Sequence, residues 1–233
     1  MTQELLPTLA VVCPLVFLAG FVDSVAGGGG LISLPAYLFA GLPIHLAYGT
    51  NKFSSACGTA VATARYLRGG YIRLPLALIS AGTALAGSWL GARLVLVASD
   101  RFLQICLLAA LPAVAIFLLF NRGFGKEAPA RELSKGSLAF RGAAIGLALG
   151  AYDGFFGPGT GTFLAIAFTA FLGLPLTTAT GNTKVVNLAS NLSALAVYAA
   201  AGSVLFPVAV PAALCADMAG FIAAAWAVRV IFY

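Results

Sequence analysis

The sequence predicts an all-α, polytopic integral membrane protein made of two related halves. Three observations support this prediction. The composition is 61% hydrophobic and only 9% charged, the mean hydropathy is +1.01, and one glycine-rich, charge-bearing segment occurs twice, about 130 positions apart. Soluble domains carry about 25% charged residues, so an ordinary soluble enzyme is excluded, and the expected surroundings are a lipid bilayer.

Basic residues account for the net charge of +6, and their positions argue against a nucleic-acid partner. Most of them lie in two hydrophilic gaps, 65–73 and 122–141. Short basic loops between apolar spans are typical of the cytoplasmic side of a membrane. The four cysteines lie singly, with no CxxC and no His/Cys ligand spacing, so we expect neither a disulfide framework nor a metal or cofactor site.

Nine apolar segments follow one another along the chain. They are Leu5–Ala26, Leu31–Ala40, Leu46–Tyr66, Leu74–Ala98, Phe102–Phe120, Leu138–Phe156, Thr162–Leu172, Thr177–Ala201 and Phe206–Tyr233. A helix needs about 20 apolar residues to cross a bilayer. The second and seventh segments are shorter and follow glycine runs, so we predict glycine-broken or re-entrant helices there.

A hydrophilic stretch divides the chain, which predicts a first transmembrane repeat at 1–120, a cytoplasmic linker at 121–137 and a second repeat at 138–233. The basic loop 65–73 corresponds to the uncharged loop 202–205, which favours inverted repeats. If the short segments only dip into the membrane and return, the repeats are parallel instead. By analogy with Phe102–Phe120, another span should follow Tyr233, where the sequence ends, so we expect the second repeat to lack its last helix.

The repeated segment places a lysine at the same point in each half. The first copy reads FVDSVAGGGG, AGLP and GTNK up to Lys52, and the second reads AYDGFFGPGTGT, LGLP and GNTK up to Lys184. An ammonium group is a compact cation with three donors, suited to a sulfite, sulfonate, carboxylate or phosphate oxygen. We therefore predict an anion site at the two lysines. The alternative is a pair of lysines that snorkel to the membrane surface.

Polar and glycine residues around the lysines complete the predicted binding site. Neutral donors precede each lysine, polar stripes at helical spacing follow it, and glycines open the backbone to a ligand. The neutral donors are Thr50, Asn51, Asn182 and Thr183, and the polar stripes are Ser55 and Thr59, and Asn187 and Asn191. The residues taken from the glycine runs are Gly28, Gly29, Gly159 and the adjoining Thr160. The alternative is that they serve only close helix packing and hydrogen bonds between helices.

Acidic residues inside apolar segments are candidates for coupling transport to protons. Asp23 and Asp153 precede the two glycine runs, and Asp217 lies in a later apolar segment without a counterpart in the first half. The first two could pair with the lysines, hold protons or cap the following helix. If they couple transport to protons, neutralising them should remove its pH dependence.

These motifs resemble the TauE/SafE family of membrane transporters, which is named for sulfite and sulfonate export. The resemblance rests on DSVAGGGG, GLP and GTNK in the first half, and on YDGFFGPGTGT and TK with Asn187 to Asn191 in the second. It implies a multi-pass carrier of small sulfur-containing or carboxylate-containing anions, located in the bacterial inner membrane.

We therefore predict a secondary transporter that exports small anions such as sulfite, sulfoacetate or related organosulfur compounds, coupled to protons or to the membrane potential. An anion channel and a non-transporting membrane subunit are the alternatives. The absence of HExxH and GxSxG motifs argues against an intramembrane enzyme. The sequence leaves room for a homo-oligomer.

Overall fold

The computed structural model describes residues 2–26, 29–120 and 133–232, and this part of the chain is helical throughout, without a strand. Nine α-helices follow one another within these residues. They are α1 (Thr2–Ala26), α2 (Gly30–Phe39), α3 (Ile44–Arg68), α4 (Leu74–Val97), α5 (Asp100–Phe120), α6 (Lys135–Phe155), α7 (Thr160–Leu172), α8 (Leu176–Ala200) and α9 (Phe206–Phe232). The all-α prediction is confirmed.

Each predicted apolar segment corresponds to one helix. Helix α6 begins at Lys135, so 135–137 of the expected linker are helical, while the greater part of that linker, 121–132, lies outside the described residues. The two short segments form α2 and α7, which have 10 and 13 residues. The chain between α6 and α7 contains Gly157 and Gly159 with φ of +88° and +80°, a conformation that glycine adopts without steric cost.

Three helices of the described part are long and apolar enough to cross a membrane, at Leu5–Asp23, Leu74–Val97 and Asp100–Phe117. Shorter apolar helices lie at Gly30–Phe39, Thr160–Leu172 and Phe206–Gly220. Helices α3 and α8 each have 25 residues, which is long enough to span. Both carry a lysine and several amide and hydroxyl side chains, which makes them less apolar.

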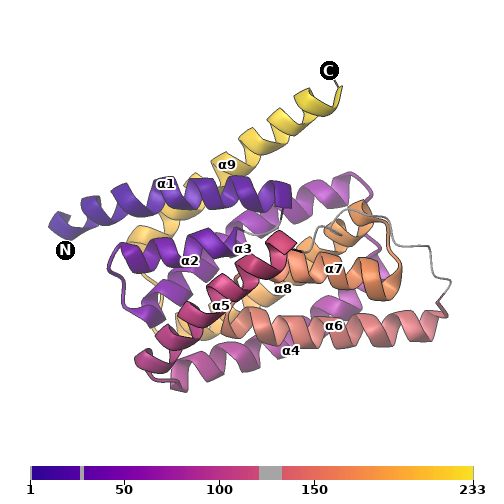
Figure 1. Ribbon diagram of the computed structural model, residues 1–233, viewed down its shortest axis with the longest axis horizontal. Coiled ribbons are helices and arrows are strands. Elements are labelled where there is room, and N and C mark those ends of the chain that lie inside the picture. The colour runs from indigo at the N-terminus through magenta and orange to yellow at the C-terminus, as the bar shows by residue number, and fades with distance from the viewer. Residues whose placement is uncertain (1, 27–28, 121–132, 233) are drawn as a thin grey trace.

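The helices pack in a matched arrangement around α3 and α8. Helix α1 lies along α9 on one side of the molecule, and α4 lies along α6 on the opposite side (Figure 1). Between them α3 contacts α2, α8 and α9, and α8 contacts α3, α4 and α7. Two related halves would give this order of contacts, and the repeat relation itself stays a prediction.

The interface between α4 and α6 is built on glycine. Helix α6 carries glycine at every fourth position of one face, namely Gly142, Gly146, Gly150 and Gly154. A Cβ atom at Gly146 would overlap the backbone of Ser80, and one at Gly154 would overlap the backbone of Ser88. Small residues at this spacing let two helix backbones approach closely in a membrane. The residue numbers of the contacting pairs increase in the same direction along both helices, so α4 and α6 run parallel.

Gly146→Ala is expected to destabilise the protein by about 1–3 kcal/mol, because the added methyl group forces α6 away from α4. Gly82→Ala on α4 is the matched control, since a Cβ at that position meets no atom within 4 Å. It should leave the stability unchanged or raise it by up to about 1 kcal/mol. Thermal unfolding of the detergent-solubilised variants measures both effects, and equal losses would contradict this account of the interface.

Candidate functional site

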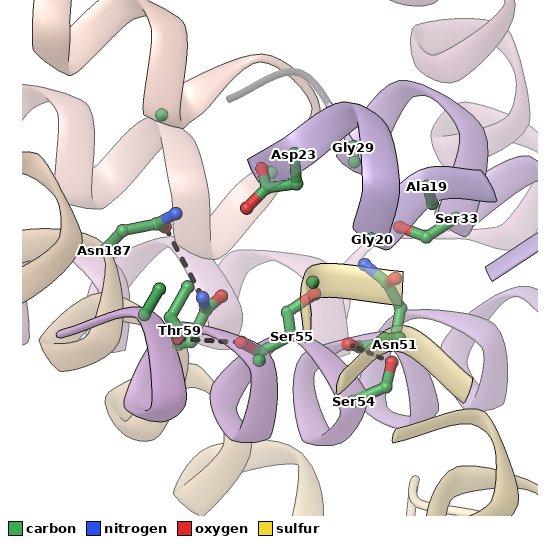
Figure 2. A pocket seen from close by; sticks show the side chains of 18 of the residues that line it. Ala19, Gly20, Asp23, Gly29, Ser33, Asn51, Ser54, Ser55, Thr59 and Asn187 are labelled. Carbon is green, nitrogen blue, oxygen red and sulfur yellow. Dashed lines mark hydrogen bonds between the residues drawn. The ribbon is translucent and has the colours of Figure 1, made fainter. Parts of the chain in front are cut away.

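A pocket lies where the broken helices meet α3 and α8, with a cavity volume of about 110 Å³. Helices α1, α2, α3, α6, α7, α8 and α9 and the chain from α6 to α7 contribute to its lining (Figure 2). Its charged side chains are Lys52, Arg65, Lys184, Asp23, Asp153 and Asp217. Its polar side chains are Asn51, Asn187, Asn191, Ser33, Ser54, Ser55, Thr59 and Thr160. The pocket thus brings three basic and three acidic side chains together.

Each predicted lysine pairs with the aspartate of the other half of the chain. Lys52 Nζ lies 2.8 Å from Asp153 Oδ2, and Lys184 Nζ lies 3.0 Å from Asp23 Oδ2. The side chains of the two lysines are only 3% and 4% exposed. The snorkelling alternative therefore does not fit, because both ammonium groups are buried against carboxylates inside the protein.

The Lys52 pair is almost completely buried, although both residues line the pocket. The Asp153 side chain is 3% exposed and accepts a hydrogen bond from Ser190 Oγ at 2.6 Å. Lys52 Nζ also donates to Asn191 Oδ1 at 3.0 Å. Ser88 Oγ of α4 donates to the backbone oxygen of Ser190 at 2.6 Å. The pair thus belongs to a buried network that joins α3, α4, α6 and α8.

The Lys184 pair is more open. The Asp23 side chain is 31% exposed, and the other oxygen that Lys184 Nζ approaches is the Asp23 backbone carbonyl, at 3.5 Å. The Asp23 carboxylate points into the pocket, on the side where the Asn187 amide points toward it (Figure 2). The two crossed pairs are therefore chemically alike and differ in their access to the pocket.

Both predicted polar stripes line the pocket. Ser55 and Thr59 follow Lys52 on α3, and Asn187 and Asn191 follow Lys184 on α8. Thr59 Oγ donates to the Ser55 carbonyl at 2.7 Å, and Asn191 Nδ2 donates to Asn187 Oδ1 at 3.4 Å. The stripes therefore face a cavity, as the sequence analysis expected, and they also bond along their own helices.

Glycines and a helix start form one wall of the pocket. Gly29, Gly159 and Thr160 line it, whereas Gly28 lies outside the described residues. Gly29 and Gly159 occupy the N-cap positions of α2 and α7, and neither makes a side-chain cap. Among the described residues, Asp23 and Asp153 do not occupy these N-cap positions, and each pairs with a lysine. The start of α7 presents backbone N–H groups and the positive end of the helix dipole.

Three of the predicted donors do not line the pocket. Thr50 Oγ accepts a hydrogen bond from the Leu205 backbone N–H at 3.0 Å. Asn182 Nδ2 donates to the Thr178 carbonyl at 2.7 Å. Thr183 is buried, but it is not part of the lining. Thr50 and Asn182 each precede their lysine by two positions, which places them about 200° around the helix from it.

Arg65 is a pocket residue that the sequence analysis assigned to a cytoplasmic gap. It lies in the last turn of α3, lines the pocket, and its Nη1 donates to the Gly220 carbonyl of α9 at 3.2 Å. Helical spacing could have found it, because the stripe of Lys52, Ser55 and Thr59 continues through residues 62 and 65 at steps of three. Ser190, which lies next to Asn191 and donates a hydrogen bond to Asp153, was not predicted from the sequence either.

Asp217 faces the same cavity from α9. Its Oδ1 is buried and has no hydrogen-bond partner among the described residues, and Arg65 is the cation that acts on it. Within the described part of the chain, no group of three or more His, Cys, Asp or Glu side chains is placed to hold a metal ion. The pocket's chemistry therefore rests on its lysines, arginine, aspartates and amides.

A bundle of apolar helices with a charged pocket at two helix breaks is the architecture of a membrane transporter. Residues 12–231 match the family described as "Sulfite exporter TauE/SafE". The chain belongs to this family, and the family's description is that of a membrane transporter.

Relatives in several bacteria support the same class. The chain is 38% identical to "Probable membrane transporter protein ORF9" of Sinorhizobium sp, over 82% of this chain and 72% of the relative. It is 36% identical to "Probable membrane transporter protein" of Haemophilus influenzae, over 86% and 77%. It is 34% identical to "Probable membrane transporter protein YfcA" of Escherichia coli K12, over 85% and 72%. No solved structure matches the chain.

Proposed function

We propose that this protein is a secondary carrier of small anions, such as sulfite, sulfoacetate or related organosulfur compounds, across the bacterial inner membrane. The observation that carries the proposal is the crossed pairing of Lys52 with Asp153 and Lys184 with Asp23 in one small pocket. Buried charge in a membrane protein is costly and marks transport pathways. The description of the family as a sulfite exporter supports the choice of anion.

Contacts between α3 and α8 support two inverted halves. Lys52 meets Asn191, while Gly49 lies against Tyr198 and Ser203, so residue numbers rise along one helix as they fall along the other. Helices α3 and α8 carry the matching GTNK and GNTK motifs, and equivalent helices run in opposite directions in an inverted repeat. The crossed ion pairs would then lie at the interface of the halves, where rocking exposes the pocket to one side at a time.

The pocket has the donors that an oxyanion needs. Lys184 and Arg65 supply positive charge, Asn187 and Asn191 supply amide groups, and the start of α7 supplies backbone N–H groups. A cavity of about 110 Å³ has room for an anion of a few heavy atoms. Asp23, Asp153 and Asp217 stay candidates for proton coupling, and the membrane potential is the other driving force, worth about 2.3 kcal/mol per charge at 100 mV.

Uptake of radiolabelled sulfoacetate and sulfite into proteoliposomes tests the proposal. We expect saturable uptake that is accelerated by unlabelled anion inside the vesicle, because a carrier exchanges its substrate across the membrane. Single-channel currents in a planar bilayer would instead establish the anion channel. Protein-dependent uptake of neither anion, together with a partner that always co-purifies, would favour a non-transporting membrane subunit.

A further inference from the structure

The two crossed ion pairs differ in what surrounds them, and this difference separates their roles. Asp153 is 3% exposed, whereas Asp23 is 31% exposed in the same pocket. Ser190 Oγ holds Asp153 at 2.6 Å, and Asn191 holds Lys52 at 3.0 Å. The Asp23 carboxylate has Lys184 as its ion-pair partner and faces the cavity. A ligand in the pocket can therefore reach the Lys184 pair without dismantling a network.

We infer that a substrate anion takes the place of Asp23 on Lys184, and that the released Asp23 carboxylate binds a proton. The Lys52–Asp153 ion pair remains intact during this exchange and holds the two halves together. This inference rests on the proposed anion transport and adds to it which lysine binds the substrate, which aspartate carries the proton, and which pair is structural.

Charge balance explains why a proton follows the anion. Before binding, Lys184 and Asp23 neutralise each other. Once the anion neutralises Lys184, Asp23 is left as a carboxylate without its cation in a pocket of low dielectric, where the uncharged form is favoured. One proton thus enters the pocket with each anion. A divalent anion such as sulfoacetate still carries one net negative charge, so the membrane potential still favours its export.

The other charged groups around Asp23 are compatible with this exchange. Helix α3 contributes Lys52 and Arg65, helix α6 contributes Asp153, helix α8 contributes Lys184 and helix α9 contributes Asp217. Helices α2 and α7 contribute no charged side chain to the pocket lining. Lys52 is already held by Asp153, and Arg65 donates to the Gly220 carbonyl and acts on Asp217. Whether Lys184 pairs with Asp23 or with the anion therefore decides whether the Asp23 side chain is charged or protonated.

The test compares Asp23→Asn with Asp100→Asn, using calorimetry with sulfoacetate near neutral pH, where the probe is fully ionised. Asp23→Asn removes the internal competitor for Lys184, so the Kd for sulfoacetate should fall about tenfold. Asp100→Asn makes the same chemical change at a 65% exposed carboxylate that does not line the pocket, so it should leave the Kd unchanged. Asp23→Ala is the second variant at the exchangeable pair.

Proton movement gives an independent reading in proteoliposomes that contain a pH-sensitive dye. Sulfoacetate flux through the unmodified protein should carry protons with it, and flux through Asp23→Asn should not. Weaker or unchanged binding by Asp23→Asn, or equal tightening by Asp100→Asn, would overturn the exchange while leaving anion transport standing. Failure of both the unmodified protein and Asp23→Asn to bind sulfoacetate or sulfite would overturn the proposed function and this inference together.

Discussion

Asp153→Asn is expected to lower the free energy of unfolding by about 3–5 kcal/mol, because it leaves the Lys52 ammonium buried without a counter-ion. Lys52 and Asp153 are each about 3% exposed, so hydration compensates only little for the lost carboxylate. The amide also weakens the charge-assisted hydrogen bond that Ser190 Oγ donates. Thermal and denaturant unfolding in detergent measure the loss.

Asp23→Asn is the matched control for this effect. It makes the same chemical change in the other crossed pair, but the carboxylate that it replaces is 31% exposed, so hydration and rearrangement offset much of the loss. We expect a clearly smaller decrease in stability. Equal decreases for the two variants would mean that both pairs are structural, and they would remove the asymmetry on which the exchange depends.

Lys184→Ala is expected to reduce sulfoacetate transport by roughly tenfold to a hundredfold, because charge-assisted hydrogen bonds contribute about 1.5–3 kcal/mol each. The substitution removes the cation that the substrate would bind. Initial rates in proteoliposomes, normalised to the amount of inserted protein, give the measurement.

Lys135→Ala provides the matched control for Lys184→Ala. Lys135 is an exposed lysine at the start of α6 and is not part of the pocket lining. Its loss removes the same charge from the protein, so we expect transport close to that of the unmodified protein. If both variants lose transport equally, net charge rather than a site at Lys184 explains the effect.

Sequence reasoning placed the helices and most of the pocket because both follow local rules. Apolar segments bounded by glycine and proline correspond to all nine described helices, and proline occupies the N-cap position of α3 and of α8. The stripes beginning at Lys52 and Lys184 reach the pocket because residues three and four apart share a helix face. The same reasoning missed Arg65, since a basic residue near the end of an apolar segment also fits a cytoplasmic loop.

The sequence by itself determined that this is a helical membrane protein with two helix breaks, and that a lysine and an aspartate of each half lie near them. Only the tertiary structure decided that each lysine pairs with the aspartate of the opposite half. The partners lie 101 and 161 positions apart, and no local rule connects residues at such separations. Which pair is enclosed and which is open depends on Ser190, Asn191 and the helices packed around them, because burial is a property of the assembled fold.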